Sequence, residues 1–113
     1  MITTNNATLN EARTYTNSIR NELRAVWAGE ALTEDGEPAD LYDYLSDAAL
    51  DVEYTLDSAR NLIGVSIWLT VGGPSCWIDT RRKEVVTAWG SERASLPLDD
   101  DICNAITELY ADI

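Results

Sequence analysis

Hydrophobic residues recur at steps of three or four between residues 8 and 28, which predicts an amphipathic helix over this segment. Thr8 and Glu11 match a capping box at its start, and Gly29 follows its end. The same spacing predicts a short helix over 40–49 and a third helix over 99–113. The third helix opens on three aspartates, which suit a helix N-terminus. Its apolar stripe consists of Ile102, Ile106, Leu109, Tyr110 and Ile113.

From residue 51 onward the apolar period changes to two, which is typical of half-buried strands. Strands are predicted over 51–57, 62–71, 76–80 and 85–89, and the segments SARN, GGPS and RRKE turn the chain between them. GSERASLP is expected to be a loop that leads into the last helix. The predicted fold is therefore a single α+β domain over 1–113. An antiparallel four-stranded meander sheet is accompanied by two N-terminal helices and one C-terminal helix.

The alternation also assigns a face to each side chain of the sheet. With Gly73 and Pro74 as the turn, Val71 is expected opposite Cys76 and Leu69 opposite Ile78. This parity places Cys76 on the inner face, where a cysteine acts as a small hydrophobic residue, and makes GGPS a bend without a chemical role. The expected inner face is Val52, Tyr54, Leu56, Ile63, Val65, Ile67, Leu69, Val71, Cys76, Ile78, Val85, Thr87 and Trp89.

The opposite face mixes carboxylates with tryptophans. Its expected members are Asp51, Glu53, Thr55, Asp57, Ser66, Trp68, Thr70, Trp77 and Asp79. On the helix over 40–49, Asp40, Asp43 and Asp47 lie three or four residues apart and are therefore neighbours. We expect these aspartates to lead into Asp51, Glu53 and Asp57 as one row of negative charge, comparable in spacing to the phosphates of DNA.

Charge is the strongest global signal in the chain. Twenty acids against eight bases give a net charge of −12. Residues 30–58 hold ten of the acids and no base, and we expect 30–39 to be an acidic loop and 1–7 to be disordered. A surface of this sign repels nucleic acid and anionic membranes and attracts basic proteins, so we expect no direct nucleic-acid binding and no membrane association. The alternative interpretation is that the acids only keep the protein soluble.

Most enzyme classes lose their usual groups in this sequence. The chain has no histidine and only two cysteines, and its glycines do not match a phosphate-binding loop. The acidic segments do not match a calcium loop, so we expect no metal, no cofactor and no catalytic activity. Two cysteines do not form a disulfide framework, and no signal peptide or membrane span is visible, so we expect a cytoplasmic protein.

The segments DVEYTLDS, LIGV, VGGPSCWIDT and AWGSERASLPL, followed by DDDICNAITELYADI, resemble small acidic accessory proteins. Such proteins are carried by phages and conjugative elements of Gram-positive bacteria, and the likeness covers roughly residues 40–113. It implies an anti-CRISPR or antirestriction role, in some cases as a DNA mimic, and supplies no catalytic residue. The basic tip Arg81, Arg82 and Lys83 departs from a pure mimic and could contact an acidic patch or guide RNA on the target.

These observations lead to one functional hypothesis and two alternatives. The hypothesis is a non-catalytic inhibitor that binds a basic protein such as a nuclease or CRISPR effector subunit. The partner-binding residues would be Asp40, Asp43, Asp47, Asp51, Glu53, Asp57, Trp68, Trp77 and Asp79. One alternative is an immunity protein or antitoxin that neutralises a basic toxin. The other is a structural adaptor in which the tryptophan face forms a homodimer.

Overall fold

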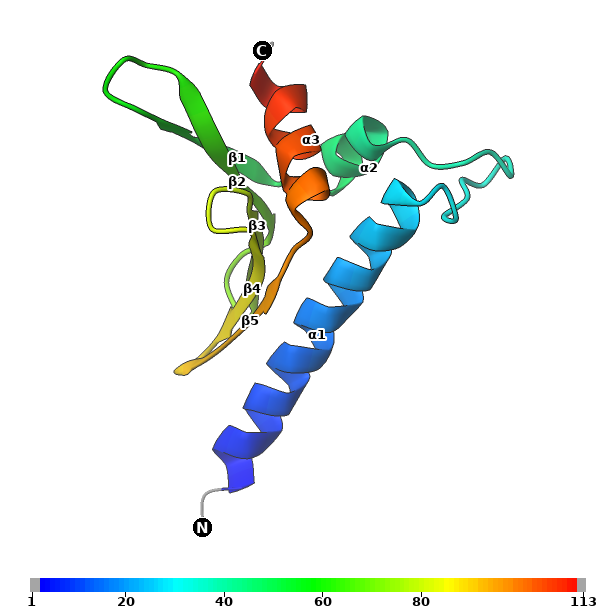
Figure 1. Cartoon of the computed structure of the whole chain (residues 1–113). Coiled ribbons are helices and arrows are strands. Elements are labelled where there is room, and N and C mark those ends of the chain that lie inside the picture. Colours follow the sequence, from blue (N-terminus) through cyan, green and yellow to red (C-terminus); the bar gives the residue numbers. More distant parts are fainter. Residues whose placement is uncertain (1–2, 112–113) are drawn as a thin grey trace.

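The computed structural model describes residues 3–111, and it describes side chains from residue 8 onward. Three helices accompany a single five-stranded antiparallel sheet, in which strands follow one another in sequence order (Figure 1). The elements are α1 (Thr3–Trp27), α2 (Leu41–Ala48), β1 (Asp51–Leu56), β2 (Leu62–Thr70), β3 (Ser75–Asp79), β4 (Glu84–Trp89), β5 (Glu92–Pro97) and α3 (Asp100–Ala111). The α+β class and the antiparallel meander predicted from the sequence are confirmed.

The prediction of four strands was wrong, because the segment assigned to a loop forms β5. Gly90 and Ser91 make a two-residue turn, with Trp89 paired to Glu92 on either side of it. Gly90 has a φ of 61°, which glycine adopts at no steric cost and which such hairpin turns require. The proline at the end of β5 is tolerated because β5 is an outer strand of the sheet.

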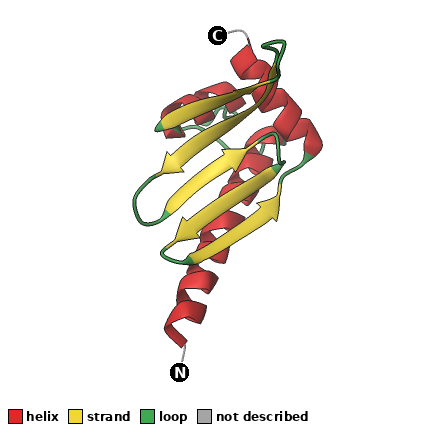
Figure 2. Cartoon of the chain, turned by 90° about the vertical axis from the view of Figure 1, so that its left-hand side faces the viewer, coloured by secondary structure: helices red, strands yellow, loops and turns green. Residues whose placement is uncertain are grey.

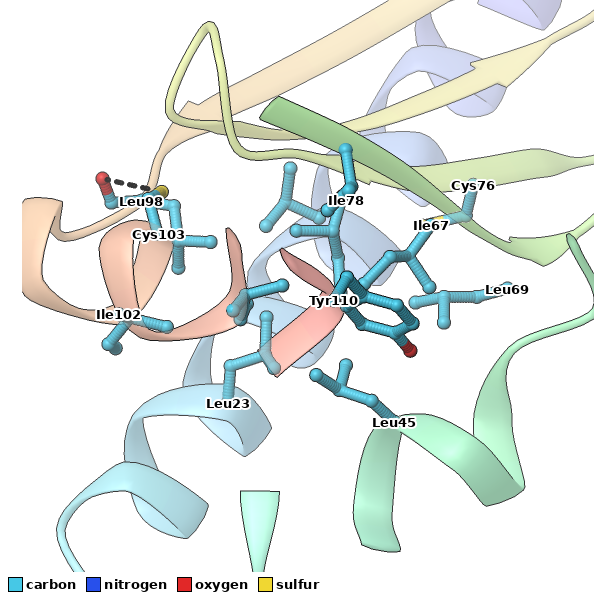
Figure 3. Close-up of a cluster of buried hydrophobic side chains, with 13 residues drawn as sticks. Leu23, Leu45, Ile67, Leu69, Cys76, Ile78, Leu98, Ile102, Cys103 and Tyr110 are labelled. Carbon is cyan, nitrogen blue, oxygen red and sulfur yellow. Dashed lines mark hydrogen bonds between the residues drawn. The ribbon is translucent and has the colours of Figure 1, made fainter. Parts of the chain in front are cut away.

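All three helices lie on the same face of the sheet. Figure 2 shows the strands in front with every helix behind them, so the face toward the viewer carries no helix. α1 packs across β4 and β5, and α3 packs against β2. We call the helix-covered side the closed face and the other side the open face. The core between the layers includes Leu23, Leu45, Val65, Ile67, Cys76, Ile78, Val85, Ile102 and Ile106, all of them almost fully buried (Figure 3).

The first helix is longer than its sequence pattern predicts. It begins at Thr3, five residues before the capping box at Thr8, and it ends at Trp27 ahead of Gly29. Residues 3–7, expected to be disordered, are thus part of α1, whereas residues 1–2 lie outside the described part of the chain. Ile113, expected on the apolar stripe of the last helix, also lies outside it.

The register between β2 and β3 differs from the predicted one by two residues. Ile67, not Leu69, lies opposite Ile78, and the pairing shifts between Trp68 and Thr70. The turn covers residues 71–74 and is longer than the two-residue Gly73-Pro74 turn on which the predicted register rests. The Thr70 hydroxyl donates to the Pro74 carbonyl at 3.0 Å. Because side chains alternate with a period of two, this two-residue shift leaves residues 66–68 and 77–79 on their predicted faces. The predicted burial of Cys76 is confirmed, whereas Val71 in the turn is 63% exposed.

Two further residues assigned to the core are also largely exposed. Tyr54 is 48% and Leu56 is 52% exposed. Both line a depression with Tyr110 of α3 and thus lie on the closed side of the sheet. The β1–β2 hairpin, however, extends past the helices, as Figure 1 shows. Tyr110 at the end of α3 meets the Tyr54 ring edge-on, but about half of Tyr54 and of Leu56 stays exposed.

Candidate protein-binding surface on the open sheet face

A pair of stacked tryptophans lies at the centre of the open face. Trp68 on β2 is directly opposite Trp77 on β3, and their ring centroids are 4.5 Å apart with planes inclined by 31°. The Trp68 Nε1 donates a hydrogen bond to Glu53 Oε1 at 2.7 Å. The guanidinium of Arg93 lies over the Trp77 ring, 5.4 Å from its centroid. The tryptophan pair is thus held in place from both flanks.

The strand register explains why these side chains meet. Residues directly opposite each other on neighbouring strands project to the same face, and one line across the sheet holds Asp51, Trp68, Trp77, Val86 and Ser95. Val86 is fully buried although no helix covers this face. Its burial indicates that neighbouring side chains, with the large Trp77 ring directly opposite, form a layer over the middle of the sheet. Both tryptophans remain only half-buried themselves.

A second line across the open face carries carboxylates. It holds Glu53, Ser66, Asp79, Glu84 and Pro97. Asp79 and Glu84 are paired directly, which brings two like charges opposite each other and is unfavourable for the sheet. Asp79 Oδ1 accepts the Arg82 backbone N–H at 3.0 Å, so this carboxylate also supports the β3–β4 turn. Carboxylates therefore border the tryptophan pair on the β1 side and along one end.

The structure does not bring the three aspartates of α2 onto this surface. Asp40 caps α2 by accepting the Asp43 backbone N–H at 3.3 Å, and α2 lies in the helical layer against α1 and α3. Asp43 and Asp47 are exposed on that layer. The single acidic row expected from the sequence is thus divided between two sides of the molecule. Only Asp51 and Glu53 of its β1 part share the open face with the tryptophans.

Asp57 supports the β1–β2 turn. Its Oδ1 accepts the backbone N–H groups of Asn61 and Ala59, each at 2.9 Å, and its Oδ2 accepts from the Asn61 side chain. These hydrogen bonds, the Asn61 backbone N–H first, lower the pKa of the Asp57 carboxyl below its usual value. The local contacts of Asp57 therefore account for its position without a partner.

Sequence reasoning missed two members of the surface, Glu84 and Arg93. Glu84 directly precedes Val85, an inward residue, so the alternation already placed it on the open face. Arg93 was assigned to a loop, and the Gly90-Ser91 turn was the signal that could have placed it on a strand.

The cysteines offer no reactive group at any surface. Both are fully buried in the core, where Cys103 Sγ lies 3.9 Å from the Leu98 carbonyl oxygen (Figure 3). Burial raises the pKa of Cys76, and it raises the pKa of Cys103 to about 11. In the described residues no cluster of histidine, cysteine and carboxylate side chains could hold a metal ion.

The basic tip at the β3–β4 turn is partly neutralised. Lys83 Nζ lies 3.1 Å from Asp100 Oδ1 at the start of α3. Arg81 packs closely against Gly64, where the Cβ of any other residue would lie 2.6 Å from the Arg81 Cβ. Both contacts fasten the turn to the rest of the domain.

Comparison with protein families, with curated proteins and with solved structures finds no match to this chain. Within residues 3–111, every helix is too short or too polar to cross a lipid bilayer.

Proposed function

We propose that this protein is a non-catalytic inhibitor that binds a basic nucleic-acid-handling protein through the open face of its sheet. The supporting observation is the half-buried tryptophan pair, which lies beside Asp51, Glu53, Asp79 and Glu84 on a face that no helix covers. Aromatic residues at the centre of a patch with polar residues at its rim are the usual anatomy of a protein interface. The partner class is a nuclease, such as a CRISPR effector subunit or a restriction enzyme.

The charge of this protein indicates the charge of its partner. The net charge of −12 steers the protein toward basic surfaces, and nucleic-acid-binding grooves are basic because they neutralise phosphates. In this proposal the open-face carboxylates take the place of phosphates, and the tryptophan pair supplies the apolar contact that carboxylates lack. The aspartates of α2 add to the long-range attraction and do not enter the same contact.

A charge-matched pair of variants tests the proposal. One triple variant is Asp51→Asn, Glu53→Gln and Asp79→Asn, which keeps an oxygen that can accept a hydrogen bond on each of these side chains. Its control is Glu30→Gln, Glu34→Gln and Asp35→Asn in the exposed 30–39 segment. Each triple variant removes three negative charges, so both change the net charge from −12 to −9.

Tagged protein is first used to capture a basic nuclease that it retains at low salt and releases at high salt. Inhibition of DNA cleavage by this nuclease is then measured for both triple variants. We expect the open-face variant to lose inhibition and the control to keep it. Equal loss in both variants would mean that net charge acts without a defined surface. A dimeric mass by light scattering that becomes monomeric in Trp77→Ala would instead assign the tryptophan face to a homodimer.

A further inference from the structure

β1 is an outer strand of the sheet whose far edge has no neighbouring strand in the described chain. The other outer strand, β5, is packed against α1, whereas β1 packs chiefly on β2. Five of the six β1 residues are exposed. An uncovered strand edge presents backbone groups to which another strand can pair.

The ladder geometry identifies which backbone groups point to the free edge. Val65 on β2 bonds toward Thr80, which accepts the Val65 N–H through its hydroxyl at 2.9 Å and donates its own N–H to the Val65 carbonyl at 3.0 Å. Backbone groups alternate in direction along a strand, so Ser66 and Trp68 bond toward β1. Accordingly, the Leu50 N–H donates to the Trp68 carbonyl at 2.8 Å.

It follows that Glu53, opposite Ser66, bonds to β2, and that Val52 and Tyr54 direct their N–H and C=O groups outward. Asp51 Oδ1 accepts a hydrogen bond from the outward Val52 N–H at 2.9 Å. A carboxylate of the same edge thus takes the place that an incoming carbonyl would take, which leaves Tyr54 as the central free position.

The two sides of this edge differ in chemistry. On the open face, Asp51 and Glu53 present carboxylates. On the closed side, the exposed Tyr54 and Leu56 form an apolar shelf with Leu62 and Tyr110. The Tyr54 and Tyr110 ring centroids are 6.4 Å apart, and a shallow depression lies between these side chains, with Arg60 and Ala111 also lining it.

We infer that the partner adds a β-strand to the free edge of β1, and that basic and apolar residues alternate along this strand. The inference rests on the proposed function, because it takes the partner to be basic. An added strand also has a period of two, so its basic residues would meet Asp51 and Glu53 while its apolar residues covered the shelf.

Charge argues against a second copy of this chain as the occupant. Two copies could pair through antiparallel β1 strands and form one continuous sheet. If the apolar sides of both strands lie on the same face of this sheet, odd-numbered residues lie opposite odd-numbered residues. The carboxylates of Asp51 and Glu53 then lie opposite or diagonal to those of the other copy, and such like-charge pairs are destabilising. A basic strand replaces this repulsion with attraction.

Two synthetic peptides of identical composition test the inference. In one, lysine and valine alternate; in the other, the lysines and valines form two blocks. We expect the alternating peptide to bind about tenfold more tightly and to slow hydrogen exchange of the Tyr54 amide by about tenfold or more. Equal binding of the two peptides, or an unprotected Tyr54 amide, would overturn strand addition.

A pair of variants separates the backbone from the side chain at the same position. Tyr54→Ala removes the ring but keeps the edge N–H, whereas Tyr54→Pro removes both. We expect Tyr54→Pro to bind the alternating peptide several-fold more weakly than Tyr54→Ala. Equal affinity would contradict strand addition. If Tyr54→Pro does not fold, amide exchange in the wild-type protein decides the question.

The outcomes also separate this inference from the proposed function. Equal binding of both peptides, together with loss of nuclease inhibition in the Asp51, Glu53 and Asp79 variant only, would refute strand addition and support the open-face inhibitor. Preferential binding of the alternating peptide without inhibition of any captured nuclease would support strand addition and refute the inhibitor.

Discussion

The two faces of the sheet are built from the same strands but are held by different interactions. On the closed face, Ile67, Ile78 and Val85 are fully buried under the helices, and they stabilise the fold through the burial of apolar surface. On the open face, Trp68 and Trp77 are half-buried and are positioned by a ring stack, a hydrogen bond to Glu53 and the Arg93 guanidinium. The closed face therefore determines stability, while the open face leaves two large apolar rings half-buried where no helix covers them.

Removal of a closed-face side chain should have the largest effect on stability. Ile78→Ala leaves a cavity beneath the helices and should lower the free energy of unfolding by about 3 kcal/mol. Urea denaturation measures the loss. Val71→Ala in the exposed turn is the control and should change stability by less than about 0.5 kcal/mol. Similar losses in the two variants would contradict the assignment of the core.

The core between the sheet and the helices should also protect its two thiols. Cys76 and Cys103 are fully buried with raised pKa values, so an aromatic disulfide reagent should modify them only after the domain opens. We expect modification in native buffer to be about a hundredfold slower, or more, than in denaturant. Rapid modification of Cys76 in the native protein would revive a chemical role for the GGPSC segment.

On the open face, a double-mutant cycle measures the hydrogen bond between Trp68 and Glu53. Trp68→Phe keeps an aromatic ring but removes the indole donor, and Glu53→Ala removes its acceptor. The coupling between these two variants should be about 1 kcal/mol, because the bond involves a carboxylate at a partly exposed site. Thermal unfolding of the four proteins gives this value. A coupling near zero would mean that the Glu53 bond does not orient the ring.

The smallest expected effect concerns the attachment of the helical layer. Arg24 on α1 pairs with Asp99, just before α3, at 2.8 Å, and its hydrogen bond lowers the pKa of the Asp99 carboxyl from the usual 3.8. Because the folded-state pKa lies below the unfolded one, the stabilisation is present above about pH 4 and is lost as pH falls through the folded pKa. The pair is exposed, so its contribution should be about 0.5 kcal/mol.

Denaturation of the wild-type protein and Asp99→Asn across this pH range measures that difference. The wild-type protein should be the more stable at neutral pH, and the difference should vanish in acid. A difference that stays constant with pH would indicate that the substitution acts through packing and not through charge.

Local patterns predicted most elements of this fold. Apolar spacing located the helices, and alternation located four strands and the face of each central side chain, including Cys76. That assignment survived a wrong turn length, because the register changed by two residues and the side-chain period is also two. The missed strand, β5, carries its signal in the Gly90-Ser91 turn more than in its own mixed composition.

The candidate surface was predicted less completely. The sequence placed Trp68, Trp77, Asp79 and Glu53 on one face, and the structure brings these side chains together. It could not separate the aspartates of α2 from those of β1, because the path of the chain between a helix and a strand depends on packing. Arg93 reaches Trp77 from β5, a contact that local spacing does not encode.

By itself, the sequence determined the periodicities, the overall acidity and the absence of histidine, since each is a property of the chain or of neighbouring residues. The extent of the helical layer over the inner face, in contrast, depends on tertiary packing. The same alternation buries Ile78 under the helical layer and leaves Tyr54 and Leu56 exposed where the hairpin passes beyond it. Burial depends on elements distant in sequence, so a pattern that assigns a side chain to a face cannot establish that anything covers it.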